Sequence, residues 1–299
     1  MVAERRLLAA LQMRLPPQLL VTIPRSTDVV GAEGSPILVV SALPGSPMST
    51  RYHGWRHVAT RSAVESDFNM AGSWLARFHA ATAGEQAPID MDGGVADILS
   101  SRFADDPAIE GALPQLRATH ARLRKSTSPR TAVHGDFWFG NLLATGDQIS
   151  GVIDWESGAI SGEPLRDVVR FAITYALYLD RHSPAGGQVA GHRGLRSGVW
   201  GSGIEFALDG TGWFSELFRQ FIAGSLSRLG ADPARWRDAA LAGIAEVAAT
   251  ADHGAFARLH FQLFARLAGR ATQLPEKLAL EIPSASAVAP APTESTRTA

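Results

Sequence analysis

HGDFWFGN at residues 134–141 and VIDWE at residues 152–156 carry most of the information in this 299-residue sequence. The first stretch has a fixed pattern: His134, one residue of any type, Asp136, four further residues and then Asn141. The second places Asp154 thirteen positions after that asparagine. Each of these polar side chains, taken alone, fits ordinary turn chemistry. Their occurrence together at fixed spacing instead favours one shared site over three unrelated turns.

The residues between the two stretches predict a β-hairpin. Residues 142–143 and 149–153 are short apolar runs, and Gly146-Asp147 between them is a dipeptide typical of hairpin turns. A hairpin brings its two ends together, so Asn141 and Asp154 are expected to lie side by side. Carboxylate and amide oxygens that face one pocket suit Mg²⁺, which takes oxygen ligands and substrate phosphates.

The whole pattern resembles the catalytic core of the protein-kinase-like superfamily. The residues of the two stretches are most similar to those of the aminoglycoside phosphotransferase and choline-kinase-like family. The resemblance implies that Asp136 is the catalytic base that accepts a proton from a substrate hydroxyl. It implies Asn141 and Asp154 as Mg²⁺ ligands, and His134 and Asp167 as structural supports of the site.

The family resemblance also predicts where ATP binds. The strand expected at residues 36–40 leads into Ser41-Ala42-Leu43-Pro44-Gly45. In the family, a strand of this kind ends at a hinge whose backbone hydrogen-bonds the adenine ring. By that match, Ser41 and Leu43 would offer backbone groups to the nucleotide. Without the resemblance, this stretch would be interpreted as an ordinary strand end with a Pro-Gly turn.

The predicted fold class is α+β, a protein-kinase-like two-lobe fold with a reduced N-lobe and a mainly helical C-lobe. We expect residues 1–45 to form the N-lobe and hinge, residues 46–282 the C-lobe, and residues 283–299, rich in Pro, Ala, Ser and Thr, a disordered tail. The family holds the nucleotide phosphates with an N-lobe lysine and a glycine-rich hairpin. The only lysines here are Lys125 and Lys277, so that part of the pattern is missing.

Apolar periodicity and capping residues predict the remaining elements. A short β-rich run is expected at residues 19–23, and residues 181–212 are expected to form a mobile loop that borders the acceptor pocket. Asp67 is expected to cap a helix. Helices are predicted at residues 4–13, 67–81, 113–123, 164–178, 213–229, 232–249 and 255–267.

Composition excludes several classes of protein. The net charge is −1 and no basic stripe is visible, which argues against nucleic-acid binding. The absence of cysteine excludes disulfides, thiolate metal sites and a cysteine nucleophile. No apolar run reaches the roughly 18 residues that a membrane span needs, and no targeting signal is visible, so a cytoplasmic protein is expected.

The sequence therefore favours an ATP- and Mg²⁺-dependent phosphotransferase that acts on a hydroxyl group of a small molecule. One alternative is a pseudokinase that binds a nucleotide or small molecule without transferring phosphate; the missing lysine favours it and the intact Asp136, Asn141 and Asp154 oppose it. A metal-dependent hydrolase ranks last, because the histidine ligands typical of that class are not in evidence. The acceptor is not readable from the sequence.

Overall fold

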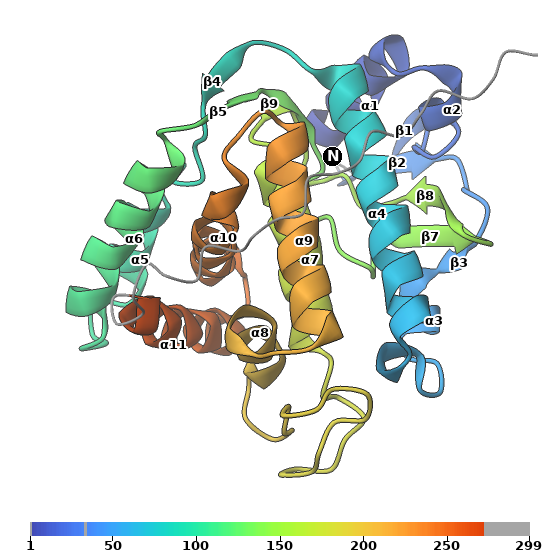
Figure 1. The fold of residues 1–299 in the computed structure, drawn as a ribbon. Helices are drawn as coiled ribbons and strands as arrows, with labels where there is room; N and C mark the ends of the chain where they lie inside the picture. Colours follow the sequence, from blue (N-terminus) through green and yellow to red (C-terminus); the bar gives the residue numbers. More distant parts are fainter. Residues whose placement is uncertain (1, 33–34, 272–299) are drawn as a thin grey trace, which may run out of the picture.

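The computed structural model describes residues 2–32 and 35–271 of the chain (Figure 1). Helices dominate it, and the mixture with small sheets agrees with the predicted α+β class. The helices are α1 (Val2–Arg14), α2 (Pro17–Leu20), α3 (Met48–Tyr52), α4 (Arg61–Thr82), α5 (Val95–Arg102), α6 (Ile109–Leu123), α7 (Leu165–Leu177), α8 (Ser202–Asp209), α9 (Trp213–Arg228), α10 (Trp236–Thr250) and α11 (Gly254–Ala271), with 3₁₀ turns at His57–Ala59 and Pro233–Arg235.

The strands form four small antiparallel sheets. They are β1 (Ser26–Ala32), β2 (Ser35–Val40), β3 (Ser46–Pro47), β4 (Gln86–Pro88), β5 (Thr127–Pro129), β6 (Thr131–Val133), β7 (Leu142–Thr145), β8 (Gln148–Val152) and β9 (Ala159–Gly162). They pair as β1-β2, β3-β7-β8, β4-β5 and β6-β9. The predicted hairpin is therefore β7-β8, in which Leu142 faces Val152 and Thr145 faces Gln148.

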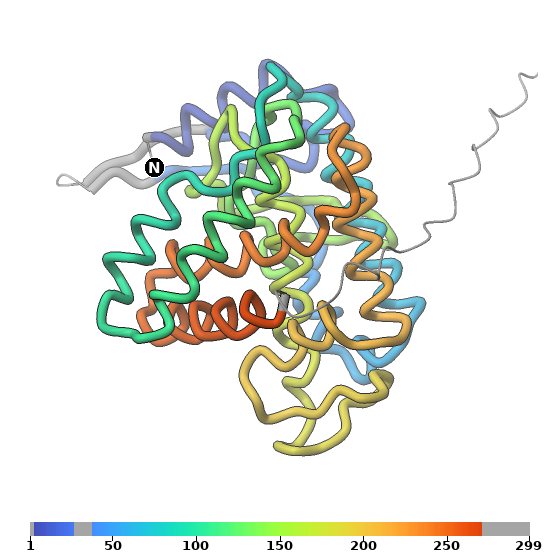
Figure 2. Tube along the Cα trace, turned by 60° about the vertical axis from the view of Figure 1, so that its left-hand side comes forward, coloured from blue at the N-terminus to red at the C-terminus, as the bar shows by residue number. Residues whose placement is uncertain are grey.

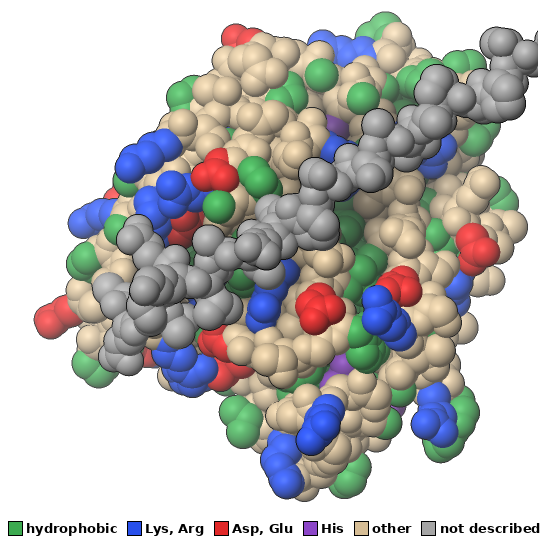
Figure 3. Space-filling view, viewed as in Figure 1, with side chains coloured by type: hydrophobic (Ala, Val, Ile, Leu, Met, Phe, Trp, Pro, Cys, Tyr) green, Lys and Arg blue, Asp and Glu red, His purple; other side chains and the backbone are tan. Residues whose placement is uncertain are grey.

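The helices pack in two groups. Helices α4, α7 and α9 lie against one another, and α5, α6, α10 and α11 form a second group (Figure 1). Figure 2 shows α6 beside α11, and it shows the loop of residues 178–201 projecting at the lower edge of the molecule. On the face drawn in Figure 3, acidic and basic side chains are interspersed. No helix of the described residues is long and apolar enough to cross a membrane.

Two local predictions were wrong. Residues 19–23 do not form a strand, because Pro17 occupies the first turn of α2 and the N–H groups of Leu19 and Leu20 bond to the carbonyl of Pro16. The segment 181–212 is not entirely a loop, since α8 lies within it. The predicted tail at residues 283–299 lies outside the described residues.

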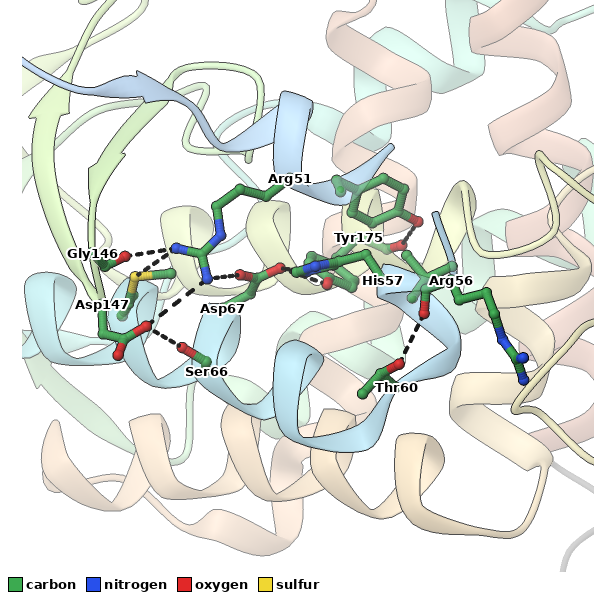
Figure 4. Close-up of polar contacts among 12 residues, drawn as sticks. Arg51, Arg56, His57, Thr60, Ser66, Asp67, Gly146, Asp147 and Tyr175 are labelled. Carbon is green, nitrogen blue, oxygen red and sulfur yellow. Dashed lines mark hydrogen bonds and ion pairs between the residues drawn. The ribbon is translucent and has the colours of Figure 1, made fainter. Parts of the chain in front are cut away.

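Asp67 was predicted to cap a helix, but it lies inside α4 with a fully buried side chain. Its Oδ2 accepts a hydrogen bond from the Tyr175 hydroxyl at 2.8 Å. The same oxygen is hydrogen-bonded to His57 Nε2 at 2.7 Å. Arg51 lies 3.8 Å from its other oxygen (Figure 4). The carboxylate is therefore occupied by tertiary contacts, and α4 begins at Arg61 instead.

The same group of contacts holds the hairpin turn. Arg51 donates a hydrogen bond to the carbonyl of Gly146 at 2.7 Å and lies 3.9 Å from Asp147 (Figure 4). The neighbouring residue Tyr52 stacks on Phe139, with ring centroids 4.3 Å apart. Helix α3 thus contacts both the turn of the hairpin and the loop that precedes it.

Trp74 is, with Trp155, one of the two largest fully buried side chains among the described residues. Its ring stacks on Phe78 and on Phe137, with centroids 4.7 and 5.3 Å away. Its indole N–H donates to the Thr22 hydroxyl at 3.0 Å, so the polar end of the ring is satisfied. Since Phe137 belongs to the HGDFWFGN stretch, this tryptophan joins α4 to that loop.

We expect Trp74→Ala to lower the free energy of unfolding by about 3–5 kcal/mol, because the substitution opens a cavity in a packed core. Trp55→Ala is the matched control, since Trp55 is 93% exposed, and its effect should stay within about 0.5 kcal/mol. Urea denaturation followed by circular dichroism measures both. Equal losses in the two variants would contradict this account of the core.

Candidate active site

The loop after β6 is fixed by His134, whose side chain is fully buried. Its Nδ1 accepts a hydrogen bond from the backbone N–H of Asp136 at 3.2 Å, so the ring proton is on Nε2, which donates to the carbonyl of Ile153 at 2.8 Å. Burial lowers the pKa of His134 to about 4. The neutral imidazole therefore links the loop to the strand end that precedes Asp154.

Glycine is required at the second position of the loop. Gly135 has φ +81°, which is rare for residues with a side chain. A Cβ atom there would lie 2.2 Å from the carbonyl oxygen of Ser157, a clash with backbone that cannot move aside. The His-Gly-Asp sequence is thus explained by the close approach of two chain segments.

Asp167 holds the backbone of the same loop from the first turn of α7. Its Oδ2 accepts from the N–H of His134 at 2.7 Å and its Oδ1 from the N–H of Gly135 at 2.9 Å. Burial raises the pKa of Asp167 to about 7, although the two backbone N–H groups act to lower it. The supporting contact expected from the family resemblance is therefore a pair of direct hydrogen bonds.

Asp136 carries its carboxylate on this loop and is partly exposed. Arg170, one turn after Asp167 on α7, donates to Asp136 Oδ1 from Nε at 2.9 Å and from Nη2 at 2.6 Å. Asn141 Nδ2 donates to the backbone carbonyl of Asp136 at 3.0 Å and to its Oδ2 at 3.2 Å. The carboxylate is held in one orientation, with Oδ2 less occupied than Oδ1.

The hairpin brings Asn141 and Asp154 together. The N–H of Ile153 donates to the carbonyl of Asn141 at 3.0 Å, so Asp154 directly follows a residue that is bonded to Asn141. Asp154 has φ +67°, an uncommon conformation that recurs at functional sites. Burial raises the pKa of Asp154, and the charges of Glu156 and Asp136 raise it further.

The donor set around Asp154 fits a hard cation that also binds phosphates. Burial, followed by repulsion among the carboxylates, raises the pKa values of Asp154 and Glu4, so added positive charge would stabilise their ionised forms. In the described ranges, no three His, Cys, Asp or Glu side chains are grouped to hold a metal by themselves. A magnesium ion with one or two protein ligands is consistent with this, because Mg²⁺ keeps waters and phosphate oxygens in its shell.

The residues expected to bind adenine lie at the end of β2. The N–H of Ser41 is already used, since it donates to the carbonyl of Arg25 at 2.9 Å, and its hydroxyl accepts from the N–H of Arg25 at 3.0 Å. Ser41 could therefore offer only its carbonyl to a nucleotide. The Leu43 side chain reaches Gly151, where an added Cβ would lie 3.0 Å from it.

The carboxylate of Asp136 lines a cavity of about 840 Å³. Three arginines of its wall are paired with carboxylates: Arg130 with Glu163, Arg166 with Glu246, and Arg170 with Asp136. Further acidic side chains line it without an ion pair among the described residues: Glu85, Glu156 and Asp252. No lining residue of this cavity comes from 181–212, so the expectation that this segment borders the acceptor pocket stays a prediction.

Arg170 and the acidic side chains of the cavity wall were not predicted from the sequence. Arg170 follows Asp167 by three residues in a predicted helix, a spacing that places both on one face. This spacing could have identified Arg170, because Asp167 was already expected to support the loop. Glu85 and Asp252 are 167 positions apart (252 − 85), and no local pattern could have joined them.

Replacing Asp167 should change how stability depends on pH. A carboxyl whose pKa rises from 3.8 when unfolded to about 7 when folded stabilises the fold fully below pH 4 and loses this contribution as the pH rises through 7. The unfolding free energy of the wild type minus that of Asp167→Asn should therefore fall by roughly 3 kcal/mol between pH 5 and pH 8. Urea titrations at both pH values measure it, and a constant difference would contradict the raised pKa.

Comparison with known proteins places these features in a family. A sequence profile of the phosphotransferase enzyme family, APH, matches residues 1–199. No curated protein sequence matches the chain. A glucosamine kinase in complex with glucosamine, ADP and inorganic phosphate is similar in structure, with a TM-score of 0.56 at 17% identity over 90% of this chain and 72% of that one.

A thermostable mutant of the aminoglycoside phosphotransferase APH(4)-Ia, in a ternary complex with AMP-PNP and hygromycin B, is also similar. Its TM-score is 0.53 at 14% identity, over 89% of this chain and 82% of that one. These structural likenesses confirm the predicted kinase-like fold. Since the profile covers 199 of 299 residues and includes the loop, the hairpin and Asp167, the chain belongs to the phosphotransferase enzyme family.

Proposed function

We propose that this protein transfers the γ-phosphoryl group of ATP, with Mg²⁺, to a hydroxyl group of a small molecule that also carries amino groups. The observation that carries the proposal is the position of Asp136. Asp136 lines the cavity of about 840 Å³, and Asn141 at the start of the hairpin donates to its carboxylate. An acceptor in the cavity and phosphates near Asp154 would thus meet at this side chain.

Each residue has a distinct part in the proposed reaction. The acceptor oxygen attacks the γ-phosphorus, the bond from phosphorus to the β–γ bridging oxygen breaks, and ADP leaves. The hydroxyl proton passes to Asp136, at Oδ2, because two N–H groups of Arg170 occupy Oδ1. Mg²⁺ held by Asp154 and Asn141 would neutralise charge on the phosphates. Ser41, through its carbonyl, and Leu43, through its backbone groups, would place the adenine.

The charges of the cavity support an acceptor with amino groups. Each arginine of the wall is paired, whereas Glu85, Glu156 and Asp252 carry no ion pair among the described residues. Unpaired carboxylates around a cavity attract cations and repel anions. The structurally similar proteins were solved with hygromycin B and with glucosamine bound. These bound molecules agree with the proposed class of acceptor.

A second candidate function is nucleotide or small-molecule binding without transfer. The observation that favours it is the Arg170–Asp136 contact, because the guanidinium occupies Oδ1 of the carboxylate that would accept the proton. The chain also lacks a lysine in the region expected to form the N-lobe. Steady ADP production that depends on an amine-bearing acceptor would exclude this candidate.

Asp154→Ala tests the phosphate side of the site. Mg²⁺ with ATP should raise the melting temperature of the wild type, since a ligand that binds only the folded state stabilises it. The variant should show no such rise. Asp147→Ala is the matched control, because Asp147 lies in the turn of the same hairpin with its side chain 86% exposed, and it should keep the rise. A rise in Asp154→Ala equal to that of the wild type would remove this residue from the site.

Asp136→Asn tests the base. Turnover, measured as ADP release with a panel of amine-bearing sugars, should fall by about 10²–10⁴-fold, the usual contribution of a general base. The Mg²⁺–ATP thermal shift should stay near that of the wild type. Asp97→Asn, at an exposed position of α5, serves as control and should leave turnover unchanged. Wild-type turnover in Asp136→Asn would show that another group accepts the proton.

A further inference from the structure

Two exposed histidines meet at the surface, one directly after α3 and the other in the segment that follows α7. His53 and His182 are 129 positions apart in the sequence. Nδ1 of His53 lies 3.2 Å from Nε2 of His182, and the two ring planes are inclined by 86°. Both residues are exposed, so dissolved ions can reach them. Neither lines the cavity at Asp136, and neither has a part in the proposed transfer of phosphate.

A hydrogen bond between the two rings is the simplest interpretation of this distance. Two neutral imidazoles can form one N–H···N bond, because each ring has one donor and one acceptor nitrogen. Such a bond adds little stability at an exposed site, where water competes for both rings. The same two nitrogens can hold a metal ion instead, if the proton between them moves to the other nitrogen of its ring.

The separation of the two nitrogens matches that of two ligands on one metal ion. Imidazole nitrogens bind Zn²⁺ at about 2.0–2.1 Å, and tetrahedral geometry then places two of them about 3.3 Å apart. The observed 3.2 Å is close to this value, so rotation of the two exposed rings would be enough to aim both nitrogens at the ion. Among the described residues no third His, Cys, Asp or Glu completes a metal-binding group, so water would fill the other positions.

The backbone beside these rings is held by buried contacts. Tyr52 precedes His53 and is fully buried, and its hydroxyl donates to the carbonyl of Tyr175 at 2.9 Å. Tyr52 also stacks on Phe139, with ring centroids 4.3 Å apart. Since Tyr175 lies on α7, which leads into the segment of His182, these contacts fix α3 against that helix. A framework that is already ordered lowers the cost of binding through both rings.

The chemistry of the pair selects the kind of metal. Neutral imidazole binds Zn²⁺, Ni²⁺ and Cu²⁺, whereas Mg²⁺ prefers oxygen ligands. Partial burial lowers the pKa of His53, and the positive charges of Arg181 and His182 lower it further. The ring of His53 is therefore mostly neutral at pH 7, which is the form that binds metals. The charge of Arg181 opposes a bound cation and should limit the affinity.

We propose that His53 and His182 form a binding site for one late first-row transition-metal ion, such as Zn²⁺ or Ni²⁺. The site is separate from the Mg²⁺ site expected at Asn141 and Asp154, and it does not depend on the proposed phosphotransferase activity. A metal bound by both rings would join the end of α3 to the segment after α7. It should therefore stabilise the folded chain.

Calorimetry with Ni²⁺ and the full chain, without an affinity tag, tests the proposal. The buffer contains millimolar Mg²⁺, which occupies sites made of oxygen ligands. We expect one Ni²⁺ per chain, and at least about tenfold weaker binding in His53→Asn and in His182→Asn, because the second ligand no longer binds intramolecularly. His253→Asn is the matched control, since His253 is the other exposed histidine of the described residues, and it should bind Ni²⁺ like the wild type. No heat at millimolar Ni²⁺, or wild-type binding in either single variant, would overturn the proposal.

A second measurement locates the ion. Zn²⁺ should shift the NMR signals of the His53 and His182 rings and leave those of the buried His134 ring unchanged. It should also raise the melting temperature of the wild type, but not that of the double variant His53→Asn/His182→Asn. Without metal the double variant should melt near the wild type, because both side chains are exposed. An equal rise in the double variant, or shifts centred on Asp154, would place the ion elsewhere and overturn the assignment.

Discussion

The site depends on the two hydrogen bonds that the Asp167 carboxylate accepts from the backbone of His134 and Gly135. Backbone N–H groups that are buried must find acceptors, and this loop supplies none of its own at these positions. The carboxylate therefore fixes the path of the loop, and the path of the loop determines where Asp136 points. Burial makes the same carboxylate costly to ionise, so the contact links loop geometry to proton uptake.

The hairpin has a separate support. Arg51 bonds the carbonyl of Gly146 in its turn and approaches the buried Asp67 on α4. Asp136, the proposed base, is thus held from α7, whereas the hairpin between the two expected metal ligands is held through α3 and α4. His134 connects the two parts, because its ring bonds both the N–H of Asp136 and the carbonyl of Ile153.

Local patterns in the sequence predicted the hairpin, because its turn dipeptide and apolar runs determine the register within a dozen residues. Long-range contacts were the source of the error at Asp67. Asp67 fits the pattern of a cap, but its acceptor capacity is used by Tyr175, 108 residues later. The acidic wall of the cavity at Asp136 likewise combines residues from distant segments, and only the fold shows that Glu85 and Asp252 line the same space.

The spacing of Asp167 and Arg170 has a consequence for how this chain can vary. One residue positions the backbone of the loop and the other bonds the carboxylate that the loop carries, and both project from successive turns of α7. An α-helix advances by about 100° per residue around its axis. A single insertion or deletion between them would turn one side chain away from the loop while leaving the other in place. Family members that keep both contacts should therefore keep three residues as the interval between these two positions.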